Sequence, residues 1–109
     1  MSGEQIISLH RYFVSAVVMR DKFYELLEGD LKEYTPQKYA VVPVAALFDF
    51  SKSGIYLRHW YASLYVVAEG WMELGLKDNK IDELLKSDLL PKLKRYRNGS
   101  FHFQKKFFD

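Results

Sequence analysis

The chain has 109 residues and a formal net charge of +2, and 49% of its residues are hydrophobic. This length supports one hydrophobic core, and this composition is typical of a globular rather than a disordered protein. Cysteine is absent, which excludes a disulfide scaffold, a zinc site built from thiolates and a cysteine nucleophile. The small net charge gives little overall electrostatic attraction to nucleic acid.

The sequence also indicates where the protein works. Its first residues, Met1 to Glu4, contain no basic region followed by an apolar run, so we expect no signal peptide. No apolar run is long enough to span a bilayer, so we expect no membrane association and a cytoplasmic setting. Aromatic residues make up 17% of the chain, which is more apolar surface than a small monomer easily hides. We therefore expect a homodimer or another self-associated form.

The first predicted element is a long amphipathic helix over residues 4–28. Apolar residues recur there at spacings of three and four, the pattern of a helix with one buried face. Gly29 and Asp30 are predicted to end the helix. We interpret Arg20, which interrupts the apolar face, as an arginine at the edge of the core; contact with a partner or a site is the alternative. The apolar positions are Ile6, Leu9, Phe13, Val17, Tyr24 and Leu27.

The segment from residue 31 to residue 54 shows no clear periodicity. Pro36 and Pro43 interrupt helical continuity. The apolar run over residues 39–50 fits either a short helix or an extended connector lying on the other helices, and its periodicity does not decide between them. Residues 51–54 are predicted to form a loop in which a serine caps the next helix.

A second long helix is predicted over residues 53–74, with Gly75 at its end. Glu69 falls at the margin of its apolar face, where an unpaired carboxylate would be costly if buried. We therefore expect a tyrosine hydroxyl, an arginine or a backbone group as its partner. The aromatic side chains of this face are interpreted as core rather than as a ligand site. The apolar face comprises Leu57, Tyr61, Leu64, Tyr65, Ala68, Trp71 and Met72.

Two shorter helices follow. The first is predicted over residues 80–86, after the capping pair Asp78-Asn79. The second begins after the capping pair Ser87-Asp88 and carries Pro91 in its first turn, where a proline is tolerated. The positions predicted to face inward are Ile81, Leu84, Leu85, Leu89, Leu90, Leu93 and Tyr96.

Together these elements predict an all-α fold, a compact helical bundle of about four main helices. The chain contains no internal repeat, no low-complexity segment and no composition shift that would mark a linker. Residues 1–109 are therefore expected to form a single domain.

Arg97 and His102 are the residues most suited to chemistry. A histidine can transfer a proton near neutral pH, and an arginine binds phosphate through its planar fork, so the pair could cleave RNA without a metal. On a continuous helix the two would point about 140° apart. Asn98 and Gly99 can end one helix and cap another, so a break there is predicted to bring the pair together. The spacing alone also fits an arginine and a histidine that merely finish a helix.

The C-terminal end is locally basic. The last 18 residues contain six lysines and arginines and one acidic residue, Asp109. Such a cluster favours contact with phosphate groups, and Lys94, Arg95 and Lys105 are the candidate RNA-binding residues. No metal and no cofactor is expected, because His10, His59 and His102 lack the spacing of metal ligands and no carboxylate cluster accompanies them.

Residues 97–102, Arg-Asn-Gly-Ser-Phe-His, match the Arg-Asn-x-x-x-His motif of HEPN domains. The resemblance to bacterial HEPN proteins extends over residues 60–71, 81–85 and 93–104, about half of the chain. It implies an antiparallel, HEPN-like helical bundle that dimerises, so that the motifs of two copies lie beside one shared cleft. Many proteins of this family are metal-independent endoribonucleases of toxin–antitoxin, abortive-infection and other defence systems.

The resemblance also implies roles for single residues. Arg97 and His102 would be the catalytic pair, Asn98 the polar residue that shapes the turn, and Glu69 a supporting acidic residue on a neighbouring helix. RNA, a second copy of the chain, and an antitoxin or other partner protein are the implied partners. Two alternatives remain open: a non-catalytic HEPN bundle that binds a partner protein or a nucleotide, and an unrelated helical interaction module.

Overall fold

The computed structural model describes residues 2–33, 48, 50–101, 103 and 105. Over these residues the chain is all helical and contains no strand, which confirms the predicted all-α bundle. None of the described helices is both long and apolar enough to cross a membrane. The helices are α1 (Gly3–Glu33), α3 (Lys52–Glu73), α4 (Asn79–Leu85) and α5 (Leu89–Phe101).

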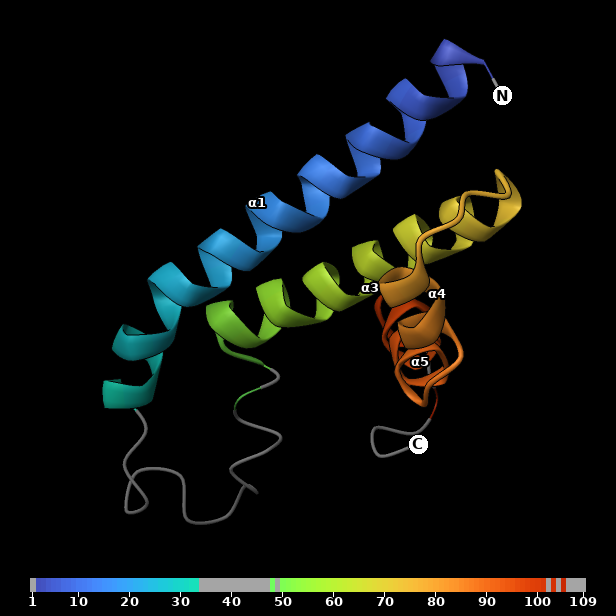
Figure 1. The fold of residues 1–109 in the computed structure, drawn as a ribbon. Coiled ribbons are helices and arrows are strands. Elements are labelled where there is room, and N and C mark those ends of the chain that lie inside the picture. Colours follow the sequence, from blue (N-terminus) through green and yellow to red (C-terminus); the bar gives the residue numbers. More distant parts are fainter. Residues whose placement is uncertain (1, 34–47, 49, 102, 104, 106–109) are drawn as a thin grey trace.

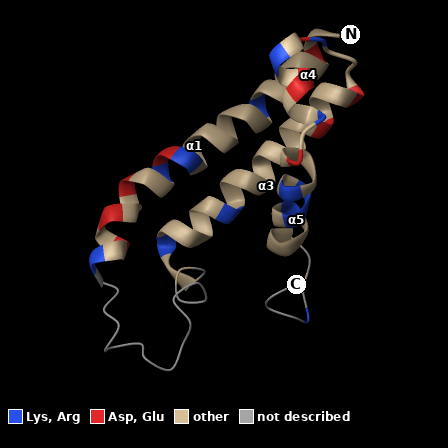
Figure 2. Cartoon of the chain, turned by 60° about the horizontal axis from the view of Figure 1, so that its bottom comes forward, with Lys and Arg blue, Asp and Glu red and all other residues tan. Residues whose placement is uncertain are grey.

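Helix α3 is the central element of the fold. It packs along α1 in the opposite direction, and it packs against α5 on another side, so α3 lies between α1 and α5 in both ribbon views (Figures 1 and 2). The short α4 links the end of α3 to the start of α5 (Figure 1). Helix α3 therefore packs against the side of α5 that faces away from solvent and holds α5 in position.

Helix α1 extends beyond its predicted end. Gly29 and Asp30 lie inside the helix, which continues to Glu33. A glycine costs up to about 1 kcal/mol in a helix interior, but it ends a helix only where the chain turns into the left-handed region. Gly29 has no positive φ. The predicted end at this glycine is wrong.

The start of α3 is held by side chains from two segments. The Ser51 hydroxyl accepts a hydrogen bond from the Gly54 amide at 3.0 Å, which confirms the predicted capping serine. Asp30 of α1 accepts a second bond, from the Ser53 amide, at 2.7 Å. These acceptors satisfy amides that a helix leaves unpaired at its first turn. The helix begins at Lys52, so the predicted loop over residues 51–54 is wrong after its first residue.

The turn from α3 into α4 follows the prediction closely. Gly75 ends α3 with a φ of 69°, the left-handed conformation that favours glycine. Asp78 caps α4 by accepting from the amides of Lys80 and Ile81 at 3.0 and 3.1 Å. The indole nitrogen of Trp71 donates to Asp82 at 3.2 Å, which joins the end of α3 to α4.

The core is small, and the prediction of which side chains fill it is partly wrong. Phe13 and Tyr24, predicted in the buried face of α1, are exposed, whereas Ala16 and Phe23 face α3. Other positions predicted to face inward are exposed as well, namely Ile6, Met72, Ile81, Leu84, Leu89 and Tyr96. The apolar side chains buried within the described part of the chain are Ala16, Phe23, Ala62, Tyr65, Ala68 and Leu93.

The predictions for Arg20 and for residues 39–50 have different outcomes. Arg20 is exposed and pairs with Asp21 at 3.2 Å on the surface, as expected for an arginine at the edge of the core. The alternatives for residues 39–50, a short helix or an extended connector, concern a segment that lies almost wholly outside the described residues.

Candidate functional site

Arg97 of α5 is held in place by two contacts. Its guanidinium carbon lies 4.9 Å from the centre of the Tyr65 ring, a cation–π contact with a residue of α3. Its Nε donates to the side-chain oxygen of Asn98 at 3.0 Å. Tyr65 is only 8% exposed, so the ring is a fixed support, while Arg97 itself is partly exposed. These two contacts hold the Arg97 guanidinium in one position at the surface of the protein.

The predicted break after Arg97 does not occur. Helix α5 runs without interruption through Asn98 and Gly99 to Phe101. The Asn98 oxygen accepts from Arg97, so this oxygen bonds a side chain instead of capping a new helix. The expectation that a break at this point folds Arg97 and His102 together is therefore wrong. His102 itself lies outside the described residues.

The last turn of α5 is anchored to the first half of α3. The Ser100 hydroxyl donates to the Arg58 carbonyl at 3.5 Å. The Phe101 ring packs edge-on against His59 with ring centres 5.8 Å apart. Because these contacts extend the packing of α5 beyond the glycine, tertiary contacts stabilise a helical turn that the local sequence favours only weakly.

The cationic residues of α5 divide between two sides of the helix. Lys94 precedes Arg97 by three positions, so on a helix the two side chains are neighbours. Arg95 precedes Arg97 by two positions and points to a different side. Both Lys94 and Arg95 are exposed, as is Lys105 beyond the helix. Of the three predicted RNA-binding residues, Lys94 is the one that α5 places beside Arg97.

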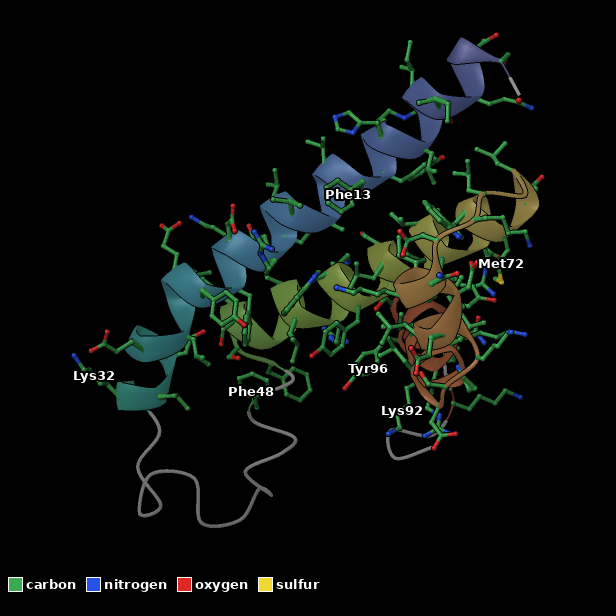
Figure 3. All side chains as sticks on the ribbon, in the orientation of Figure 1. Phe13, Lys32, Phe48, Met72, Lys92 and Tyr96 are labelled. Carbon is green, nitrogen blue, oxygen red and sulfur yellow. The ribbon has the colours of Figure 1, made fainter. Side chains whose placement is uncertain are left out.

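Helix α5 is uniformly basic on its exposed surface. Its 13 residues contain two lysines, two arginines and no acidic residue, and Figure 2 shows these cations gathered on one short helix. Tyr96 of the same helix contacts α3, where its ring meets that of Tyr61 edge-on with the ring centres 4.9 Å apart (Figure 3). The helix therefore buries Leu93 against α3, sets Arg97 over the Tyr65 ring, and exposes Lys92, Lys94 and Arg95.

Glu69, one turn after Tyr65 on α3, faces the space between α1 and α3. It lines a cavity of about 340 Å³ between α1 and α3, together with Ser8, Tyr12 and Glu73. None of the ion pairs among the described residues joins Glu69 to Arg97, and none of the hydrogen bonds there gives Glu69 the predicted partner. The structure does not bring this predicted supporting residue to the arginine.

Tyr65 is the functional candidate that sequence reasoning missed. Its place in the apolar face of the long helix predicts an aromatic core residue, and it is buried. Its contact with Arg97 joins residues 32 positions apart in the sequence. Periodicity along one helix carries no information about which residue of another helix lies over a given ring, so the sequence offered no signal for this contact.

No protein-family model, no curated protein and no solved structure matches the chain. The described residues contain no group of three or more histidines, aspartates or glutamates that could hold a metal ion. The candidate site therefore consists of Arg97, its contacts with Tyr65 and Asn98, and the neighbouring cations of α5.

Proposed function

We propose that this protein is a metal-independent endoribonuclease of the HEPN type. In this proposal two copies of the chain place their Arg97 and His102 residues beside one cleft, in which RNA is cut. The observation that carries the proposal is the fixed Arg97, held over Tyr65 and bonded to Asn98 at a partly exposed edge of a basic helix. The identity of the motif residues, Arg-Asn-x-x-x-His, supplies the histidine.

The proposed reaction is an attack by the ribose 2′-oxygen on the adjacent phosphorus. His102 removes the 2′-hydroxyl proton or protonates the departing 5′-oxygen, and the products are a 2′,3′-cyclic phosphate and a 5′-hydroxyl. Arg97 stabilises the negative charge that develops on the phosphate oxygens. Since Asn98 accepts the Nε proton, phosphate would be bound by the two terminal nitrogens, Nη1 and Nη2.

The surroundings of Arg97 support a polyanionic substrate. Lys94 neighbours it on α5, and the helix has no acidic residue that would repel a phosphate backbone. Single-stranded RNA binds such surfaces mainly by releasing counterions as its phosphates are neutralised. A toxin or defence role in the cytoplasm, with an antitoxin as partner, is the biological setting that the HEPN resemblance suggests.

The test is RNA cleavage in the presence of a chelator, with the association state of each variant checked. We expect the wild type to cleave, and we expect His102→Ala to lower kcat by about 10²- to 10⁴-fold, the usual contribution of acid–base catalysis. We expect Arg97→Ala to be similarly impaired. Lys22→Ala is the control, because it removes one positive charge from α1 and none from the proposed RNA-binding residues of α5.

Two results would count against the proposal. Cleavage that persists unchanged in His102→Ala would come from a contaminant. Absence of cleavage by the wild type across varied RNAs would favour the non-catalytic alternative, a bundle that binds a partner protein or a nucleotide. The Lys22→Ala control separates the loss of the positioned Arg97 guanidinium from the loss of one positive charge elsewhere on the protein.

A further inference from the structure

The last turn of α5 carries an exposed phenylalanine next to the arginine of the candidate site. Phe101 follows Arg97 by four positions, so on the helix the two side chains are neighbours. Four residues of an α-helix span about 6 Å along its axis. Phe101 is 54% exposed. An aromatic ring that is open to solvent therefore lies within about one helical turn of the Arg97 guanidinium.

Contacts with α3 hold the Phe101 ring in position. The ring meets that of His59 with the ring centres 5.8 Å apart and an angle of 83° between the planes. The Nδ1 of His59 lies 2.9 Å from the Ile55 carbonyl, which only accepts hydrogen bonds, so Nδ1 carries the proton and this bond orients the imidazole. One residue before Phe101, the Ser100 hydroxyl donates to the Arg58 carbonyl. Because perpendicular rings touch along one edge, this support leaves much of Phe101 uncovered.

We propose that Phe101 is a stacking platform for one base of the RNA, next to the phosphate that Arg97 binds. Proteins hold single-stranded nucleic acid by this combination, in which cations bind the phosphates and aromatic rings stack on the faces of the bases. The base and the phosphate of a nucleotide are joined through one sugar, so one nucleotide spans the distance between these neighbouring side chains. RNA is the substrate in the proposed function, on which this inference rests.

The charges around Phe101 favour a nucleic acid over an apolar partner protein. Helix α5 contains two lysines, two arginines and no acidic residue (Figure 2). Beyond the helix, Phe103 is 91% exposed and Lys105 is exposed as well. An apolar partner that covered Phe101 would remove nearby cations from water without supplying a counter-charge, which is costly. A strand of RNA supplies a base for the ring and phosphates for the cations.

Stacking on Phe101 requires a base that has left its own stack. In a double-stranded segment the neighbouring base pairs cover both faces of each base, whereas loops, bulges and ends offer bases that can be splayed out. Stacking discriminates little between bases, because every base has a π-face. The platform therefore selects RNA for an unpaired nucleotide beside the bound phosphate, and only weakly for the identity of that nucleotide.

The first test measures the binding of RNA that cannot be cut. A 2′-O-methyl hexauridylate has no free 2′-hydroxyl to attack the phosphorus, so its affinity is independent of catalysis. A 2′-O-methyl sugar–phosphate backbone of the same length without bases is the matched ligand. In fluorescence-anisotropy titrations we expect Phe101→Ala to weaken hexauridylate binding about 5- to 150-fold, the range for loss of a stacking aromatic, and to change backbone binding less than about twofold.

Three further variants separate stacking from other effects of the substitution. Phe101→Tyr keeps the ring and should bind hexauridylate like the wild type. Phe101→Leu keeps an apolar side chain without a ring and should bind as weakly as Phe101→Ala. Phe13→Ala is the matched control, because it removes an exposed phenylalanine from α1, and both affinities should stay unchanged. Circular dichroism verifies that each variant remains helical.

Equal weakening of both ligands by Phe101→Ala would overturn the proposal, because the effect would then come from α5 or from chain association and not from a base. Unchanged hexauridylate affinity in Phe101→Ala, or no binding by the wild type, would overturn it as well. These results are distinct from the outcome of the cleavage assay. A protein that cuts RNA without the Phe101 effect refutes only the platform, and one that shows the effect but cuts no RNA refutes only the ribonuclease.

The second test observes the stacked base directly by NMR. An aromatic ring shifts the resonances of protons above its face upfield. At saturating protein we expect the H5 and H6 resonances of one uridine to move upfield with the wild type and with Phe101→Tyr. With Phe101→Leu this shift should disappear. An upfield shift that persists in Phe101→Leu would show that the base stacks on another ring and would overturn the assignment to Phe101.

Discussion

Arg97 shows how a surface arginine can be given one position. A free arginine side chain has four rotatable bonds and loses up to about 2 kcal/mol of conformational entropy when it is fixed. Here the Tyr65 ring and the Asn98 oxygen hold the guanidinium before any ligand arrives. A positioned guanidinium binds phosphate at a lower entropic cost than a mobile one. The proposed chemistry therefore depends on Tyr65 as well as on Arg97.

The first prediction concerns this support. Tyr65→Leu removes the ring, and since an exposed to partly buried cation–π contact is worth about 0.5–2 kcal/mol, we expect kcat/KM for RNA cleavage to fall about 3- to 30-fold. Tyr65→Phe keeps the ring and should stay close to the wild type. The Arg97 Nε–H resonance in NMR provides a reading independent of activity. It should carry a ring-current shift in the wild type and in Tyr65→Phe, and that shift should vanish in Tyr65→Leu.

The second prediction concerns Asp30, which caps a helix other than its own. Its carboxylate accepts from the Ser53 amide in the first turn of α3, where the helix dipole favours a negative charge. We expect Asp30→Ala to lower the free energy of unfolding by about 1 kcal/mol, the usual cost of losing a cap. Asp21→Ala, which removes an exposed carboxylate from the same helix, should change it by less than half as much. Equal effects in urea melts would contradict the capping role.

At the scale of the helices, Gly54 and Gly99 differ in the space that is left for a side chain. Gly54, in the first turn of α3, lies so close to the Phe48 carbonyl that an added methyl group would overlap it. Gly99, in the last turns of α5, has open space around the position of a side chain. The first glycine is needed for packing against the backbone, and the second only lowers the stability of its helix.

The third prediction follows from this contrast. Gly54→Ala should destabilise the protein by about 1–3 kcal/mol or more, the range for forcing extra atoms into a packed region, because backbone must move to accept the methyl group. Gly99→Ala should stabilise it by about 0.5–1 kcal/mol, because alanine is the better helix former. Thermal or urea unfolding of both variants measures the difference. Destabilisation by Gly99→Ala would indicate that α5 does not continue through this position.

At the scale of the whole molecule, charge is distributed unevenly over a nearly neutral chain. The net charge is +2, yet α5 carries four cations and no acid. Acidic residues on the other helices offset these cations in the total, so the net charge hides a local basic surface. Local charge, within about one Debye length of 8–10 Å, is what a bound phosphate backbone experiences.

The fourth prediction uses this local charge. If RNA contacts α5, its affinity should fall as salt rises, and each phosphate contact should contribute about 0.7 to the slope of log K against log salt for a single strand. Lys94→Gln should therefore reduce the slope by about 0.7. Lys22→Gln on α1, which removes the same charge on a different helix, should leave it unchanged. Equal reductions in fluorescence-anisotropy titrations would show that binding is not localised on α5.

The local sequence by itself determined most of the helices and several of their ends. Apolar periodicity places the two long helices, and the caps at Ser51, Asp78 and Gly75 lie where residue types predict them. These features depend on contacts within about four residues, so a single sequence contains the information. The residues around Arg97 were likewise identified as a candidate site from the motif alone.

The tertiary structure decided which face of each helix is buried and which side chains meet. Helix α1 has two apolar faces, and only the position of α3 selects Phe23 over Phe13 for the core. The continuation of α5 through Gly99 and the support of Arg97 by Tyr65 both depend on contacts between helices. Such contacts join residues far apart in sequence, and the periodicity of one helix does not encode its packing partner.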